Sequence, residues 1–126
     1  MKELMTRQNH RILVVEDDDD IRDTLREVLI AEGYEVDVAK DGLDAYSKLQ
    51  AGEHASLVLL DMMMPRMDGE TFLTTLKRHP ELADVRVIVL SGNALARDRA
   101  EELAAAACLV KPFELDDLLG VVHRFA

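Results

Sequence analysis

The sequence predicts an α/β fold, a doubly wound five-stranded parallel sheet with helices on both faces. Three short runs are almost continuously apolar: RILVV at 11–15, ASLVLL at 55–60 and VRVIVL at 85–90. Such runs are typical of strands that are covered on both faces, as in a parallel sheet. Segments with helical periodicity lie between them. Because parallel strands need crossover connections, these helices must cover both faces of one sheet.

The remaining elements complete an alternating order of strands and helices. YEVDVA at 34–39 alternates apolar and polar residues, which predicts a half-exposed edge strand, and CLVK at 108–111 is a short fifth run. Apolar stripes predict five helices, marked by Ile21, Leu25, Val28 and Leu29, by Leu43, Tyr46 and Leu49, by Phe72, Leu73 and Leu76, by the alanine-rich segment 95–107, and by Leu115, Leu118, Leu119 and Val122. Gly33, Gly52 and Pro80 lie where the first three helices should end.

Size and composition fit a single domain. A chain of 126 residues can bury one core without disulfides or a structural metal. The formal charge of −10 argues against binding to nucleic acid or to an anionic membrane surface. No run approaches the roughly 20 apolar residues of a membrane span. The N-terminal MKELMTRQNH also lacks the apolar centre of a signal peptide, so a cytoplasmic protein is expected.

Acidic, hydroxyl or basic residues that could take part in catalysis or ligand binding follow four of the five predicted strands. EDDDD at 16–20 follows the first strand, Asp61 the third and Ser91 the fourth, while Lys111 and Pro112 close the fifth. In sheets of this kind, ligands bind beyond the carboxyl ends of the strands. These residues are therefore the candidates for a functional site.

The acids at 16–20 divide into two groups. Acids at a helix start cap its backbone N–H groups and favour the positive end of the dipole, which is the interpretation for residues 18–20. Glu16 and Asp17 instead lie where the buried strand ends, and with Asp61 they would crowd one pocket. Two unit charges about 4 Å apart repel by roughly 4 kcal/mol at an effective dielectric of about 20. A hard divalent cation would offset this repulsion, and an all-oxygen site suits Mg²⁺.

This set of residues predicts phosphoryl chemistry at Asp61. A carboxylate beside Mg²⁺, Lys111 and the Ser91 hydroxyl can attack a phosphoryl group and form an aspartyl phosphate, because the positive charges neutralise the transferring oxygens. The segment LLDMMMPRMDG at 59–69 raises the alternative of a soft-metal site. No His or Cys lies nearby in the sequence to complete one, so Met62 and Met64 are interpreted as packing or loop residues.

Four segments in this order resemble the receiver domain of bacterial two-component response regulators. They are ILVVEDD at 12–18, LVLLDMMMPRMDG at 57–69, VIVLSGNA at 87–94 and LVKPF at 109–113. The resemblance covers nearly the whole chain. It implies a flavodoxin-like sheet of order 2-1-3-4-5 with five helices, a receiver domain at 11–126 and an N-terminal extension at 1–10.

The resemblance also implies roles for the catalytic residues. Asp61 is the expected phospho-acceptor, Lys111 is expected to pair with the phosphoryl group, and Ser91 is expected to bond one of its oxygens. The Lys111–Pro112 peptide is expected to be cis.

The resemblance implies a magnesium site as well. Asp17 and Asp61 are expected to bind Mg²⁺, Glu16 to act through water, and Met63 to contribute its backbone carbonyl. The expected phosphodonor is a histidine kinase or a phosphotransfer protein.

The chain departs from the family pattern near its fifth strand. Cys108 stands where an aromatic switch residue is common, the segment between Ser91 and Lys111 is slightly short, and AAAA at 104–107 replaces a Gly-Ala. Retained phosphoryl chemistry with altered switching is therefore expected, with the helix before the strand repositioned. Cys108 is interpreted as a small buried hydrophobe rather than a redox site. The four histidines are interpreted as surface residues.

Partners and alternatives remain open at this point. The domain is expected to act through contacts with a downstream protein, as a monomer or as a phosphorylation-dependent dimer, either alone or as part of a larger chain. One alternative is a receiver-like module that works without phosphorylation. Another is a Mg²⁺-dependent phosphohydrolase of the haloacid-dehalogenase type. It is disfavoured because that type has a second Asp two residues after the nucleophile, where Met63 stands here.

Overall fold

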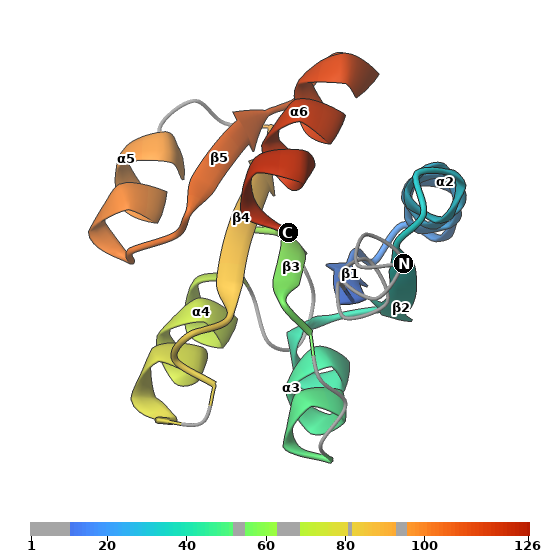
Figure 1. The fold of residues 1–126 in the computed structure, drawn as a ribbon. Coiled ribbons are helices and arrows are strands. Elements are labelled where there is room, and N and C mark those ends of the chain that lie inside the picture. The colour runs from blue at the N-terminus through green and yellow to red at the C-terminus, as the bar shows by residue number, and fades with distance from the viewer. Residues whose placement is uncertain (1–10, 52–54, 63–68, 81, 93–95) are drawn as a thin grey trace.

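The computed structural model describes residues 11–51, 55–62, 69–80, 82–92 and 96–126. Strands and helices alternate along the chain (Figure 1), in the order β1 (Arg11–Val15), α2 (Asp19–Ala31), β2 (Glu35–Ala39), α3 (Gly42–Gln50), β3 (Leu57–Asp61), α4 (Gly69–Arg78), β4 (Arg86–Ser91), α5 (Ala96–Glu102), β5 (Ala107–Val110) and α6 (Leu115–Phe125). This order confirms the predicted fold class. None of the described helices has the length and apolar character needed to cross a membrane.

The five strands form one parallel sheet in the order β2-β1-β3-β4-β5, which confirms the expected topology. β1 lies between β2 and β3, so the direction of winding reverses there. At such a switch point the carboxyl ends of the neighbouring strands border a crevice. The register places Val15 opposite Leu60 and Asp61 opposite Leu90, so the ends of β1, β3 and β4 lie level with one another.

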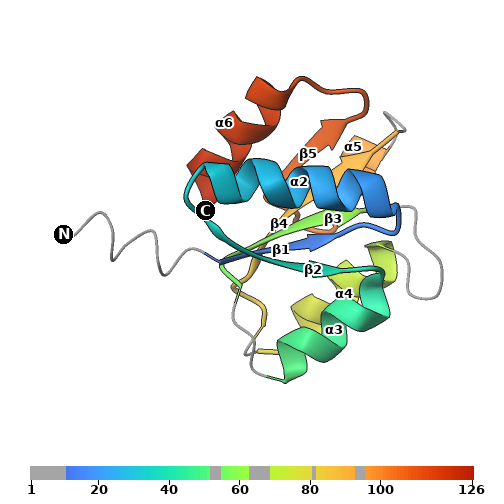
Figure 2. The ribbon, with the colours of Figure 1, turned by 90° about the vertical axis from the view of Figure 1, so that its right-hand side faces the viewer.

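Helices cover both faces of the sheet. Figure 2 shows α2 and α6 on one side and α3 and α4 on the other, and α5 packs on the side of α3 and α4. Alternate residues of each central strand point to opposite cores. Ile12 and Val14 belong to the cluster that includes Leu25 of α2 and Leu118 of α6, whereas Leu13 belongs to the cluster with α3 and α4. This double burial explains why the central strands are continuously apolar.

The alanine-rich segment departs from its prediction as a helix over 95–107, because α5 ends at Glu102. Ala104 adopts a left-handed φ of 61°, and its N–H donates to the Glu101 carbonyl at 3.0 Å. The Ala105 N–H donates to the Ala100 carbonyl at 3.0 Å. These two bonds form a Schellman motif, which closes the helix. Beyond it, pairing with β4 overrides alanine's helical propensity, and β5 begins at residue 107 rather than 108.

α2 ends in the same Schellman motif, but with glycine, the residue that the motif favours, in the left-handed position. Gly33 has a φ of 95°, and its N–H donates to the Ile30 carbonyl at 3.0 Å. The Tyr34 N–H donates to the Leu29 carbonyl at 3.2 Å. The predicted helix end at Gly33 is therefore confirmed, whereas the end predicted at Gly52 lies outside the described residues.

Candidate functional site

Backbone pairing brings Glu16 and Asp61 to the same edge of the sheet. Asp61 is the last residue of β3, and Val15 pairs with the residue before it. One step further along β1, the Glu16 N–H donates to the Ala39 carbonyl of β2 at 3.1 Å. The end of β1 is thus fixed between β2 and β3.

Three carboxylates converge at this edge. Glu16, Asp17 and Asp61 each place one oxygen so that all three lie within 4.8 Å of one another. Glu16 and Asp61 are only 2% and 6% exposed, whereas Asp17 is exposed. The predicted crowding of the three acids is therefore present in the fold. Met63, the fourth expected metal ligand, lies outside the described residues.

Lys111 lies against this acidic cluster. Its Nζ is 3.8 Å from Glu16 Oε1 and 3.9 Å from Asp61 Oδ1. Its backbone N–H donates to the Ser91 carbonyl at 2.6 Å, which ties the end of β5 to the end of β4. The Lys111–Pro112 peptide is cis, as expected. One cation thus faces two buried acids.

Ser91 reaches the same edge from β4. It is 2% exposed and follows Leu90, which pairs with Asp61. The Met62 N–H donates to the Leu90 carbonyl at 3.2 Å and so continues the pairing beyond Asp61. All the predicted site residues within the described part of the chain therefore lie at the carboxyl ends of β1, β3, β4 and β5.

The electrostatics of Glu16 show that the cluster lacks positive charge. The pKa of Glu16 is raised to about 8, because burial, a hydrogen bond with Asp61 and the negative charge of Asp61 all raise it and Lys111 lowers it only in part. Glu16 Oε2 is buried and has no hydrogen-bond partner among the described residues. A buried carboxylate oxygen in this position needs a proton or a cation. The donors are all oxygens, so the site fits a hard cation such as Mg²⁺.

The other acids of the EDDDD segment have structural roles. Asp18 is the N-cap of α2, and its Oδ1 accepts a hydrogen bond from the Ile21 N–H at 3.0 Å. Asp19 and Asp20 lie in the first turn, where acids favour the helix dipole. This confirms the interpretation of residues 18–20 as capping residues.

Two residues near the site were missed by the sequence reasoning. A Cβ at Gly69 would lie 2.7 Å from Met62 Cα and 3.0 Å from the Asp61 carbonyl oxygen, so only glycine fits there. The Asp-Gly pair that opens α4 was the available signal. Arg22 donates from Nη1 to the Glu16 carbonyl at 3.0 Å. No sequence pattern pointed to that contact.

Of the histidines and the cysteine, those in the described part of the chain (His79, His123 and Cys108) do not belong to the acidic cluster. His123 is exposed, but His79 is half-buried, with its Nε2 2.7 Å from the Tyr46 hydroxyl, so its assignment to the surface was wrong. His10 and His54 lie outside the described residues. Cys108, which was predicted to be a small buried hydrophobe, packs against the core that α3 and α4 cover but is only half-buried on β5.

Comparison with known families decides the classification. Residues 12–123 match the sequence model of the response regulator receiver domain. The chain belongs to this family. It is thus a receiver domain of a two-component response regulator, a class that binds Mg²⁺ at an acidic pocket.

Characterised relatives support the classification. The response regulator MprA of Mycobacterium sp. (strain KMS) is 40% identical over 112 residues, which cover 87% of this chain and 47% of MprA. The transcriptional regulatory protein CpxR homolog of Haemophilus influenzae is 38% identical with the same coverage. The receiver chain therefore spans about half the length of these relatives.

Solved structures show the same fold. The chemotaxis response regulator CheY4 of Vibrio cholerae superimposes with a TM-score of 0.85 at 27% identity, over 93% of this chain and 98% of that one. The response regulator TrrA of Thermotoga maritima, solved in complex with Mg²⁺–BeF, gives a TM-score of 0.83 at 34% identity, over 93% and 99%.

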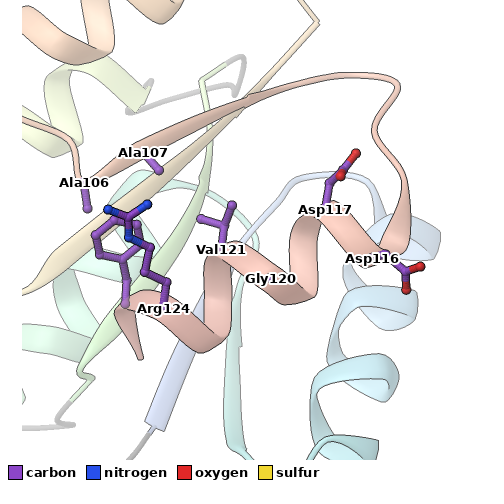
Figure 3. Close-up of a pocket in the computed structure, with 8 residues that line it drawn as sticks. Ala106, Ala107, Asp116, Asp117, Gly120, Val121 and Arg124 are labelled. Atoms are coloured by element: carbon purple, nitrogen blue, oxygen red, sulfur yellow. The ribbon is translucent and has the colours of Figure 1, made fainter.

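The described residues of the receiver domain also line two surface hollows that bear on its contacts. A groove of about 320 Å³ lies between α2 and α6 and is lined by Asp20, Ile21, Thr24, Leu25, Val28, Phe113, Leu115 and Leu118. A hollow of about 450 Å³ lies along α6 and the start of β5. Figure 3 shows Arg124 beside Ala106 and Ala107 at one end of this hollow, and Asp116 and Asp117 at the other.

Proposed function

We propose that this receiver domain accepts a phosphoryl group on Asp61 in a Mg²⁺-dependent reaction and that the modification changes its contacts with a protein partner. The observation that carries the proposal is the convergence of three carboxylates and Lys111 at the sheet switch point. Glu16 Oε2, which is buried and has no hydrogen-bond partner among the described residues, adds that this cluster has room for a proton or a cation.

The acidic cluster would hold the metal. Asp17 and Asp61 are the proposed direct ligands, Glu16 acts directly or through water, and the Met63 carbonyl is a further proposed ligand. When bound, Mg²⁺ would neutralise charge on the phosphoryl oxygens. The complex of TrrA with Mg²⁺–BeF supports a magnesium site in a related receiver.

Three side chains of the site have separate roles in the proposed reaction. An Asp61 carboxylate oxygen attacks phosphorus while the bond from phosphorus to the donor nitrogen breaks, and the nitrogen keeps the electron pair. Lys111, whose Nζ already lies 3.9 Å from Asp61 Oδ1, would pair with the oxygens of the transferred group. The Ser91 hydroxyl is the proposed donor to another of these oxygens.

The groove between α2 and α6 is the proposed docking surface for the phosphodonor protein. It adjoins the site along the chain, because Asp20 comes shortly after Asp17, and Phe113 comes two residues after Lys111. Its rim exposes Ile21 (41%) and Leu115 (49%), which suits the apolar face of a helical partner. A donor seated there can reach Asp61.

A charged substitution in this groove should distinguish an effect on kinase docking from an effect on the phosphoryl transfer reaction. We expect Ile21→Glu to slow phosphotransfer from the cognate kinase about tenfold or more, since it buries a charge in the interface. Phosphorylation by acetyl phosphate should stay unchanged. Leu43→Glu is the matched control, because Leu43 is equally exposed (42%) on α3, across the sheet. If Ile21→Glu and Leu43→Glu slowed phosphotransfer from the kinase equally, the groove between α2 and α6 would not be the docking surface.

Intact-mass measurement tests the proposed reaction itself. The protein is incubated with Mg²⁺ and acetyl phosphate, and one added phosphoryl group is expected. The addition should vanish in Asp61→Asn and when Mg²⁺ is chelated. An unmodified wild type that also binds no Mg²⁺ would overturn the proposal and favour a receiver-like module that works without phosphorylation.

The domain limits and the output remain part of the proposal. Residues 11–126 are proposed as the receiver domain and 1–10 as an extension. The downstream contact is proposed for the surface of α5, β5 and α6, which includes the hollow in Figure 3. The change from monomer to dimer on phosphorylation and the cytoplasmic location remain predictions.

A further inference from the structure

Arg22 contacts the segment that carries the metal-binding acids. From α2, its Nη1 donates to the Glu16 carbonyl at 3.0 Å, and its Nη2 contacts the Asp19 carboxylate. The side chain is only 16% exposed, whereas that of Asp19 is 81% exposed. The guanidinium is therefore packed against the end of β1 rather than extended into solvent.

The turn from β1 into α2 is fixed at both ends, and Arg22 makes two of the bonds. On the strand side, the Glu16 N–H donates to Ala39 and the Glu16 carbonyl accepts from the Arg22 guanidinium. On the helix side, the Arg22 N–H donates to the Asp18 carbonyl at 2.9 Å. Asp17 lies between these two points. One arginine thus brackets the exposed acid of the cluster.

The chemistry of the contact favours arginine over lysine. The planar guanidinium offers several N–H donors in a fixed fork and can bond a carbonyl and a carboxylate at the same time. A lysine ammonium can bond either acceptor but does not fix their relative positions. If the guanidinium were removed, the Glu16 carbonyl would lose its side-chain partner beside a charged cluster.

We infer that Arg22 is a positioning residue of the phosphorylation site, which holds the turn over residues 16–18 so that Glu16 and Asp17 keep the geometry that binds Mg²⁺. Arg22 touches neither the metal nor the phosphoryl group in this role. It acts through the backbone of the ligands, as outer-shell partners of metal sites do. The inference rests on the proposed function of the acidic cluster.

Magnesium affinity, measured by calorimetry with the metal alone, tests the inference. Outer-shell substitutions typically weaken metal binding about 10–100-fold, so Arg22→Ala should raise the Kd for Mg²⁺ at least about tenfold, with Arg22→Lys between it and the wild type. Arg26→Ala is the matched control, because Arg26 is exposed one turn further along α2. Amide exchange at Asp17 in the metal-free protein should become faster in Arg22→Ala only.

The outcomes separate positioning from general stabilisation. If Arg22 only stabilised the fold, Arg22→Ala would lower Tm but bind Mg²⁺ with wild-type affinity well below that temperature, and the inference would be wrong. If Arg22→Ala fails to fold, the test is made with Arg22→Lys. Wild-type Mg²⁺ affinity in Arg22→Lys would overturn the inference that the Arg22 guanidinium positions Glu16 and Asp17. A wild type that binds Mg²⁺ but is not phosphorylated would overturn the proposed function and leave the Kd comparison valid.

Discussion

The switch-point site and the edge of the sheet around β5 differ in how well the local sequence suits the local structure. At the switch point, β1 and β3 are buried and Asp18 caps α2, and the far end of that helix closes on Gly33 in the conformation that glycine favours. At the other edge, every residue of β5 is only half-buried, and α5 closes on Ala104. A side chain with a Cβ is strained at a φ of 61°.

By this difference, the acids of the proposed phosphorylation site and its proposed output surface rest on largely separate strands, and Lys111 at the end of β5 joins the two. The acids depend on β1 and β3, each of which is paired with a strand on both sides. The proposed output surface depends on α5 and β5, where the sequence predicts a departure from the family pattern at Cys108 and at residues 104–107. Substitutions at one region should therefore leave the other largely unchanged.

Gly69 gives the largest expected effect on the switch-point side. In Gly69→Ala the new Cβ would meet the backbone of Met62 at 2.7 Å, and the chain after Asp61 would have to shift. We expect a loss of about 1–3 kcal/mol in the free energy of unfolding together with slower phosphorylation. Denaturant unfolding followed by circular dichroism and the acetyl phosphate assay measure the two effects.

Gly120 is the matched control for this substitution. It lies inside α6, with open space where a Cβ would be, so Gly120→Ala should stabilise the protein by about 0.5–1 kcal/mol. Its phosphorylation rate should not change. Similar changes in stability and phosphorylation rate in the two alanine variants would contradict the close approach of Gly69 to the backbone of Asp61 and Met62.

The acidic cluster should give the stability of the metal-free protein a distinctive pH dependence. The pKa of Glu16 is raised from 4.5 to about 8, so between these values the folded protein keeps a proton that the unfolded chain has released. The free energy of unfolding should therefore fall as the pH rises through this window. Mg²⁺, which competes with that proton, should stabilise the protein most at the upper end.

Glu16→Gln isolates this contribution, because it removes the titrating group. Urea unfolding in chelator should show a smaller decline with pH in Glu16→Gln than in the wild type, whereas Glu27→Gln on the exposed face of α2 should follow the wild type. Parallel pH profiles for the wild type and Glu16→Gln would show that Glu16 does not hold the proton.

The two Schellman motifs allow the smallest and most specific test of the comparison. Ala104→Gly should raise the free energy of unfolding by about 1 kcal/mol, since it relieves a left-handed alanine. Gly33→Ala should lower it by a similar amount. Neither change should alter the rate of phosphorylation by acetyl phosphate. A destabilised Ala104→Gly variant would mean that the end of α5 is not strained.

Much of the fold follows from local patterns. The central strands were recognisable because both their faces are buried, and Gly33 marked a helix end that needs positive φ. The end of α5 was not recognisable, because four alanines favour a helix, yet the chain closes on a left-handed Ala104 and then pairs with β4. Tertiary contacts decided against local propensity there.

The site was predictable to the extent that strand ends meet at one edge. That rule and the family motifs together predict five of the site residues: Glu16, Asp17, Asp61, Ser91 and Lys111. Arg22 and Gly69 did not, because their importance lies in contacts with backbone atoms of other residues. Such contacts leave no pattern in the spacing of residue types.

The most direct test of the central claim is to locate the phosphoryl group. After reaction with Mg²⁺ and acetyl phosphate, borohydride reduction converts an aspartyl phosphate to homoserine, and peptide mass spectrometry identifies the position. We predict homoserine at position 61 alone. Homoserine at position 17, or phosphate retained on a serine or histidine with Asp61 intact, would contradict the account.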